Sequence, residues 1–125
     1  MKKKDRNDQI YLEDILISME RIIEYIGEKT FEEFVNDNMV VDAVVRNFEI
    51  IGEATNNVPE EIKNRHPDMP WRKMYGLRNV VSHAYFGIDH ELIWEITQNN
   101  LPENIKEIKR IIDEEKTSGF NQIYE

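Results

Sequence analysis

The apolar residues near the start of the chain recur at steps of three and four, which predicts a long amphipathic helix. Gly27 follows this pattern and should end the helix. Thr30 and Glu33 have the spacing of a capping box, so a short helix is expected directly after the glycine. The apolar positions of the long helix are Leu12, Ile15, Leu16, Met19, Ile22, Ile23 and Ile26.

A second long helix is predicted after the polar residues 36–38. It should end near Asn56 and Asn57, and Pro59 suits the first position of a further short helix over 59–65. The apolar face of the second long helix consists of Val41, Val44, Val45, Phe48 and Ile51.

Pro67 and Pro70 then interrupt the pattern. Asp68 is placed to cap a third long helix, which should begin near Pro70 and stop at Gly87. The core face of this expected helix consists of Trp71, Met74, Leu77, Val81 and Ala84.

Asp89 is placed to cap the next helix, over 90–100, and Pro102 to begin another, over 102–116. We find no internal repeat, no low-complexity linker and no convincing strand pattern. The sequence therefore predicts an all-α fold. We expect one domain over residues 1–125, built as an antiparallel bundle of four to five main helices.

The composition fits a helical protein of the reducing cytoplasm. The chain has 125 residues and no cysteine, so no disulfide can form. The basic N-terminus is soon followed by Glu13 and Asp14 with no apolar run behind it, which argues against a signal peptide. No segment approaches the roughly 20 apolar residues of a membrane span. We expect a cytoplasmic protein without membrane contact.

The charge is unevenly distributed along the chain. The formal net charge of −9 argues against a general nucleic-acid coat protein. Residues 62–85, however, hold five basic residues against one acid, Asp68. This basic segment is either a solvated helix face or part of a cleft for an anionic substrate. The five basic residues are Lys63, Arg65, Arg72, Lys73 and Arg78.

The stretch "YGLRNVVSHAY" over 75–85 places Arg78, His83 and Tyr85 within eight residues. Arginine can grip a phosphate with two parallel hydrogen bonds, and histidine can exchange a proton near neutral pH. Such a pair suits RNA cleavage, in which the 2′-hydroxyl attacks the adjacent phosphorus. The alternative is that His83 caps a helix or packs as a buried ring.

No metal or cofactor site is predicted. His66, His83 and His90 lack metal-ligand spacing, there is no thiolate, and the glycines form no phosphate-binding loop.

Helical geometry separates the two candidate catalytic groups. On a regular helix Arg78 and Tyr85 share a face, whereas Arg78 and His83 lie about 140° apart. Either the helix loosens near Gly87, or a second copy of the chain completes the site.

The segment "RNVVSHAY" matches the R-x4-H-x-Y signature of the HEPN superfamily, and the chain resembles its HepT-like branch. The similarity runs continuously over residues 46–96 and extends to the N-terminal helix. The resemblance implies a homodimer that joins through the motif-bearing helices, and a metal-independent endoribonuclease. It assigns catalysis to Arg78 and His83, with Asn79 as the supporting polar position.

The resemblance also implies a toxin whose antitoxin is a minimal nucleotidyltransferase that adenylylates Tyr85. A non-catalytic dimeric subunit, modified by the same partner, is the alternative function.

Three other residues have weaker cases. Trp71 and Trp94 could stack on bases, but both fall at apolar positions that favour core packing. Glu53 lies on the second long helix with Arg46, Asn47 and Glu49, and it either pairs with a cation of the motif or is solvated.

Overall fold

The computed structural model describes residues 6–82 and 87–124, and these residues form helices and short connections without any strand. The all-α prediction is therefore confirmed. The elements are α1 (Arg6–Ile26), α2 (Phe31–Val35), α3 (Asn38–Asn57), α4 (Glu60–Arg65), α5 (Trp71–Tyr75), α6 (Leu77–Ser82), α7 (His90–Glu95), the π-helical turn η2 (Ile96–Asn100) and α8 (Leu101–Tyr124).

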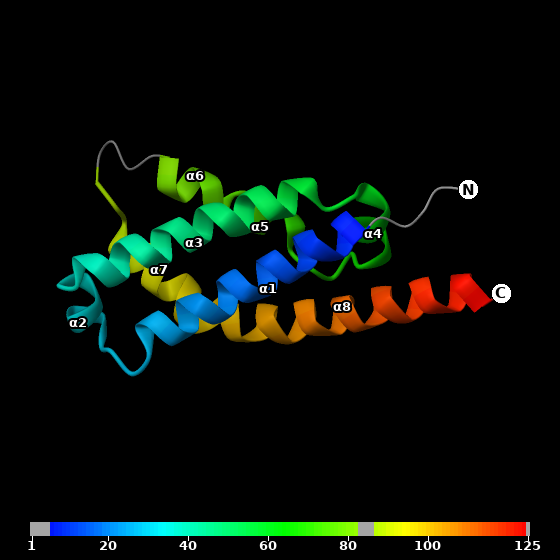
Figure 1. Ribbon diagram of the computed structural model, residues 1–125. Helices are drawn as coiled ribbons and strands as arrows, with labels where there is room; N and C mark the ends of the chain where they lie inside the picture. Colours follow the sequence, from blue (N-terminus) through cyan, green and yellow to red (C-terminus); the bar gives the residue numbers. More distant parts are fainter. Residues whose placement is uncertain (1–5, 83–86, 125) are drawn as a thin grey trace.

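Three long helices form the body of the bundle. Figure 1 shows α1 beside both α3 and α8, running antiparallel to each of them, while α5 and α6 lie along α3. The largest fully buried side chains come from these helices, from the shorter ones that cover their ends and from the connection between α4 and α5: Leu12, Ile15, Met19, Ile22, Phe34, Phe48, Ile51, Ile62, Met69, Met74, Ile93 and Leu101. Ile23, which we expected in the core, is 39% exposed because it lies at the edge of the apolar stripe of α1.

The helix ends follow the predicted capping chemistry. Gly27 has φ +53°, a left-handed conformation that glycine adopts at low cost after a helix. Thr30 and Glu33 form the capping box at α2, with N–H to side-chain oxygen distances of 2.9 and 3.1 Å. Asp89 accepts from the N–H of Leu92 at 3.0 Å and so caps α7. Pro59 precedes α4 by one residue rather than beginning it.

The predicted third long helix is wrong in two respects. The helical segment is divided at Gly76 into α5 and α6, and Pro70, not Asp68, is the N-cap residue. Glycine has a low helix propensity, and here it follows only five helical residues. Of the expected core positions, Met74 and Leu77 are buried, and the side chains of Val81 and Ala84 lie outside the described part of the chain.

The last two predicted helices are continuous rather than separate. The turn η2 joins α7 to α8, and Pro102 lies in the first turn of α8 instead of beginning it. Proline has no N–H to donate, and just before it the N–H of Leu101 reaches back five residues to the carbonyl of Ile96. A π turn keeps residues four apart on one face, so Ile93, Thr97 and Leu101 are all buried. The helix then continues to Tyr124.

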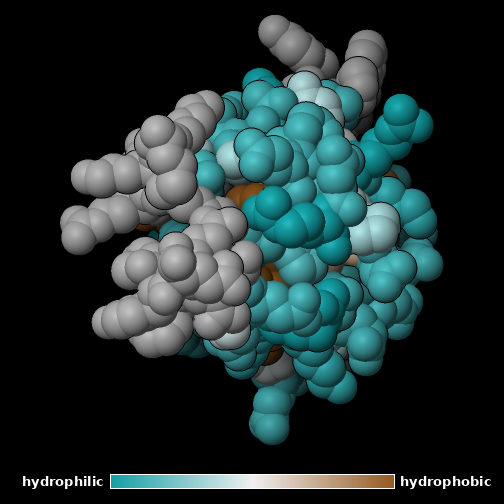
Figure 2. All heavy atoms as spheres, turned by 90° about the vertical axis from the view of Figure 1, so that its right-hand side faces the viewer, coloured by the Kyte–Doolittle hydropathy of each residue, from teal (hydrophilic) through white to brown (hydrophobic). Residues whose placement is uncertain are grey.

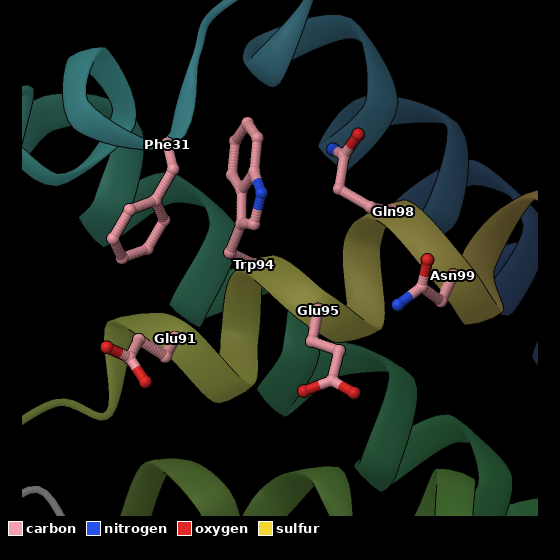
Figure 3. A pocket seen from close by; sticks show the side chains of 6 residues that line it. All are labelled: Phe31, Glu91, Trp94, Glu95, Gln98 and Asn99. Atoms are coloured by element: carbon pink, nitrogen blue, oxygen red, sulfur yellow. The ribbon is translucent and has the colours of Figure 1, made fainter.

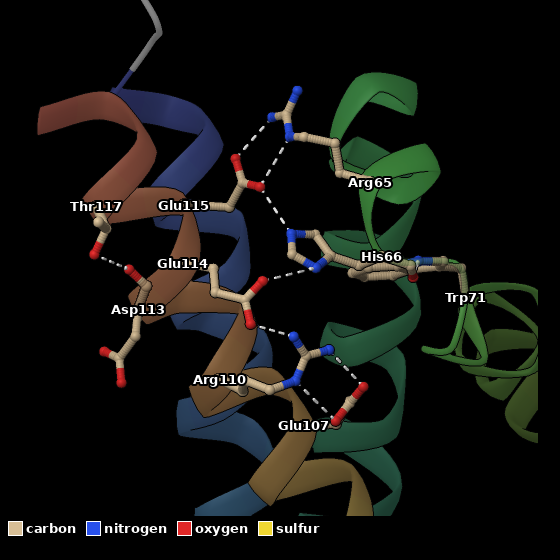
Figure 4. Close-up of polar contacts among 9 residues, drawn as sticks. All are labelled: Arg65, His66, Trp71, Glu107, Arg110, Asp113, Glu114, Glu115 and Thr117. Carbon is tan, nitrogen blue, oxygen red and sulfur yellow. Dashed lines mark hydrogen bonds and ion pairs between the residues drawn. The ribbon is translucent and has the colours of Figure 1, made fainter. Parts of the chain in front are cut away.

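A buried carboxylate links α8 to the end of α4. Glu115 of α8 is only 2% exposed and accepts two hydrogen bonds from Arg65, with distances of 3.0 and 2.7 Å (Figure 4). Its Oε2 also lies 2.8 Å from Nε2 of His66, which is itself 5% exposed. Hydrogen bonds to Glu115 raise the pKa of Arg65, although burial opposes the shift. The sequence pattern did not indicate this cluster.

A second group of ion pairs lies on the surface of α8, next to the Glu115 cluster. Arg110 pairs with both Glu107 and Glu114, and Glu114 lies 3.9 Å from Nδ1 of His66. The hydrogen bond from Arg110 lowers the pKa of Glu107. These exposed pairs are expected to contribute little to stability.

The surface formed by the described side chains is mainly polar at the end of the molecule where α4 lies. Figure 2 shows hydrophobic surface there only in small hollows between hydrophilic side chains. Among the residues that the structure describes, no helix combines the length and the apolar character that a membrane span requires.

We predict that Glu115→Gln lowers the free energy of unfolding by about 2 kcal/mol, because it removes the charge from a buried acceptor that serves two partners. Urea denaturation followed by circular dichroism measures this loss. Glu114→Gln is the matched control, since its side chain is 51% exposed and should change stability by less than about 0.5 kcal/mol. Equal urea midpoints for the two variants would contradict a structural role for Glu115.

Candidate active site

At the candidate site, α3 packs closely against the segment formed by α5 and α6. A Cβ atom placed on Gly52 would lie 2.4 Å from Cγ of Arg78, 3.0 Å from its backbone nitrogen and 3.1 Å from the carbonyl oxygen of Tyr75. Two of these three atoms belong to the backbone and cannot move without shifting the segment. Only glycine therefore allows α6 to approach α3 this closely.

Arg78 is held from two sides. Its stem lies against α3 at Gly52, and its Nη2 lies 3.3 Å from Oε1 of Glu53. Its guanidinium carbon is 6.0 Å from the centroid of the Tyr75 ring, within reach of a cation–π interaction. The side chain remains 42% exposed, so a phosphate in solvent can reach it. The hypothesis that Glu53 pairs with a cation of the motif is confirmed.

The remaining predicted site residues are only partly described. Asn79 is exposed, and its N–H donates to the carbonyl of Gly76 at 2.9 Å. His83 and Tyr85 lie outside the described residues, so their placement relative to Arg78 stays a prediction. On α3, Arg46 is exposed, whereas Asn47 is buried and donates to the carbonyl of Ala43 at 2.8 Å. Asn47 therefore does not share the surface of Arg46 and Glu53.

A hollow of about 490 Å³ lies between α3, α4 and α5, and Tyr75 is one of its lining residues. We call it the α3–α5 hollow. Its lining residues combine aromatic rings, cations and amides, with one carboxylate from Glu60. The other principal lining residues are Asn56, Lys63, Asn64, Trp71, Arg72 and Tyr75.

The five basic residues of segment 62–85 do not act as one surface. Arg65 is bound to the buried Glu115, and it therefore belongs to the fold rather than to a substrate cleft. Arg78 pairs with Glu53, while Lys63 and Arg72 line the α3–α5 hollow. The interpretation of the basic segment as part of a cleft therefore does not extend to Arg65.

The described histidines have structural contacts. His66 lies in the Glu115 cluster, and the ring of His90 packs edge-on at 6.5 Å from that of Phe34. Within residues 6–82 and 87–124, no group of three histidine or carboxylate side chains could hold a metal ion.

Comparison with protein families gives one decisive match. The family model described as "Ribonuclease HepT-like" matches residues 15–111, which include α3, α5, α6 and the entire 78–85 motif. The chain belongs to the HepT-like ribonuclease family. The resemblance inferred from the residues 78–85 and their context is thereby confirmed.

Individual relatives match most of the chain. "Putative RNase MJ0127" of Methanocaldococcus jannaschii is 43% identical over 98% of this chain and 100% of its own length. "Putative RNase TTE0752" of Caldanaerobacter subterraneus subsp. tengcongensis is 42% identical over 85% of this chain and 95% of its own. "Probable ribonuclease HepT" of Thermococcus cleftensis is 42% identical over 78% and 88%, respectively. No solved structure gave a significant match.

Sequence reasoning missed Gly52 and Tyr75 as parts of this HepT-like site. A single glycine inside a strong helical pattern does carry a signal, because it costs helix stability unless close packing requires it. For Tyr75 the signal was its spacing from Arg78, because residues three apart are neighbours on a helix surface.

We predict that Gly52→Ala destabilises the protein by about 1–2 kcal/mol, because the added methyl group overpacks the contact with α6. Alanine in an unhindered helix position would instead stabilise by up to about 1 kcal/mol. Urea denaturation measures the difference.

The same substitution in an Arg78→Ala background is the control. Removing Cγ of Arg78 eliminates the 2.4 Å contact but keeps the two backbone contacts, so the loss should become smaller by about 1 kcal/mol. A Gly52→Ala variant more stable than the wild type would refute the close approach.

Proposed function

We propose that this HepT-like protein is a metal-independent endoribonuclease in which Arg78 and His83 cleave RNA at the cleft of a homodimer. The observation that carries this proposal is the surface arginine of the family motif. Gly52 fixes the backbone of Arg78, Glu53 and Tyr75 flank its guanidinium, and its side chain remains accessible. Family membership and relatives named as ribonucleases support RNA as the substrate.

The proposed reaction needs one base, one acid and one cation. A His83 imidazole takes the proton of the 2′-hydroxyl, and the 2′-oxygen forms a bond to the adjacent phosphorus. The bond from phosphorus to the 5′-oxygen breaks, and this oxygen receives a proton from a protonated imidazole. Arg78 stabilises the charge that develops on the phosphoryl oxygens. The products are a 2′,3′-cyclic phosphate and a free 5′-hydroxyl.

A homodimer supplies both proton carriers. A two-fold interface through the motif-bearing helices places two copies of Arg78 and His83 around one cleft. One His83 then acts as the base and the other as the acid. This arrangement removes the difficulty that Arg78 and His83 lie about 140° apart on a regular helix. Asn79, exposed and adjacent to Arg78, is proposed to support substrate binding.

The proposed biological setting is a cytoplasmic toxin–antitoxin pair. In this setting the antitoxin is a minimal nucleotidyltransferase, and it neutralises the ribonuclease by adenylylating Tyr85. The added adenylyl group is bulky and carries a negative phosphodiester, so it would compete with RNA for Arg78 and repel the incoming backbone. No cofactor is required by the proposed cleavage.

We predict that His83→Ala lowers the rate of RNA cleavage by about 10²–10⁴, because it removes the general acid and base. Arg78→Ala should also lower the rate strongly, whereas Arg21→Ala on the exposed surface of α1 should not. The wild type should cleave in the presence of a chelator and leave a cyclic phosphate, detected by mass spectrometry. It should not cleave at a 2′-deoxy position.

Two outcomes would overturn this proposal. Full activity in His83→Ala would eliminate the catalytic role of the histidine, and a clean monomer by light scattering that still cleaves would eliminate the shared cleft. Absence of cleavage by the wild type, together with modification by the nucleotidyltransferase, would favour the non-catalytic subunit instead.

We predict that co-expression with a minimal nucleotidyltransferase adds adenylyl groups to Tyr85 and abolishes cleavage. Peptide mass spectrometry locates the modification. Tyr75→Phe is the matched control, because Tyr75 is an exposed tyrosine near Arg78 that should not be needed for inhibition. Inhibition that persists unchanged in Tyr85→Phe would show that this tyrosine is not the regulated group.

A further inference from the structure

The α3–α5 hollow lies next to Arg78, and Tyr75 connects the two. The Tyr75 ring lines the hollow, and the same ring has the Arg78 guanidinium 6.0 Å from its centroid. Asn56, one turn beyond Gly52 on α3, brings the helix that supports Arg78 into the wall of the hollow. A chain molecule whose phosphate rests at Arg78 therefore reaches this hollow with its neighbouring unit.

The cations of the hollow are available to a ligand. Within the described part of the chain, neither Lys63 nor Arg72 has an ion-pair partner. Arg65 and Arg78, by contrast, are paired with Glu115 and Glu53. Lys63 and Arg72 come from different helices and line one hollow, so a phosphate can bind between them.

The aromatic wall of the hollow is held in place from behind. Nε1 of Trp71 donates to the carbonyl of His66 at 2.9 Å, and His66 is in turn fixed by Glu115. Trp71 is only partly buried, and its hydrogen bond to His66 keeps the ring from rotating freely. A ring fixed before binding loses little conformational entropy when a flat group stacks on it. Tyr75, 41% exposed, is the second ring of the hollow.

A second hollow, of about 450 Å³, provides an instructive contrast. It is formed by α2, α7 and η2, and Figure 3 shows Trp94 facing Phe31 with Glu91 and Glu95 on the same helix. It also contains a tryptophan and two amides, from Gln98 and Asn99, but no cation. Its two carboxylates would repel a phosphate. Aromatic and amide groups occur in both hollows, but only the α3–α5 hollow combines them with cations.

We propose that the α3–α5 hollow binds one unpaired nucleotide of the RNA, next to the phosphate that Arg78 holds. This inference rests on the proposed function. Trp71 and Tyr75 stack on the base, as aromatic side chains do in single-strand binding proteins, and Lys63 and Arg72 hold its phosphate. The amides of Asn56 and Asn64 and the carboxylate of Glu60 contact the base edge. A base can enter only when it is unstacked, so the preferred substrate is single-stranded RNA or a loop.

A binding experiment with an RNA that cannot be cleaved tests this site apart from catalysis. The probe is a fluorescent hexanucleotide of mixed sequence with 2′-O-methyl groups, which lacks the attacking hydroxyl. Fluorescence anisotropy measures its Kd for the full chain and for the double variant Lys63→Ala/Arg72→Ala. We expect the double variant to bind at least tenfold more weakly, and the same oligonucleotide in a duplex to bind the wild type more weakly than the single strand.

The matched control is Arg21→Ala/Lys116→Ala, which removes the same two charges from exposed positions on α1 and α8. Its Kd should change less than threefold. In a Trp94→Phe background Trp71 is the single remaining tryptophan, and its fluorescence should be quenched by the probe.

Several outcomes would overturn the nucleotide site. These are no detectable binding by the wild type, equal Kd values for the two double variants, or unchanged Trp71 fluorescence on binding. A double variant that loses the dimer by light scattering would assign the hollow to a subunit contact instead. If Arg78 and His83 are needed for cleavage but Lys63 and Arg72 are not needed for binding, the catalytic proposal stands and the nucleotide site fails. If the probe binds as expected but RNA is never cleaved, the nucleotide site stands and the catalytic proposal fails.

Discussion

The buried carboxylate of Glu115 is the constraint on which the arrangement of the site depends. It fixes Arg65 and His66 at the end of α4 against α8, about 50 residues away in sequence. The carbonyl of His66 then holds the indole of Trp71 at the start of α5. The next turn of α5 ends in Tyr75, which contacts Arg78. Through these contacts, the charge of Glu115, far from the candidate site, sets the position of α5, which carries Tyr75.

The ion pair between Arg78 and Glu53 differs from the ion pair of Glu115 in its exposure to solvent. Arg78 and Glu53 are both about half exposed, so their attraction is weakened by solvent and can be exchanged for another anion at low cost. Glu115 is buried and has two partners, so its ion pair is not open to exchange. In a chain of net charge −9, this division fits the proposed binding of an anionic substrate, because the pair that a phosphate would displace at Arg78 is the exposed one with Glu53.

The long helices and their caps were predictable, because apolar periodicity and capping residues act within a few residues of each other. Thr30, Glu33 and Asp89 behave as their local pattern indicates. The break at Gly76 has a local cause in the low helix propensity of glycine, but the close approach of Gly52 to Tyr75 and Arg78 was not predictable in this way, since the two segments are distant in sequence. Glu115 was missed for the same reason: a glutamate on an acidic helix resembles its solvated neighbours until Arg65 and His66 fold onto it.

The π turn η2 has a consequence for the length of the chain. Its hydrogen bond spans five residues instead of four, so the turn holds more residues than a regular helical turn would. Deleting one residue between Trp94 and Leu101 would convert the turn to regular helix and leave the later side chains close to their present phase, with Glu115 still on the side of α8 that faces Arg65. Deleting one residue from the regular turns between Leu101 and Glu115 would instead rotate Glu115 by about 100° about the helix axis and move it away from Arg65. The π turn is therefore a place where this helix can lose a residue without losing its buried ion pair.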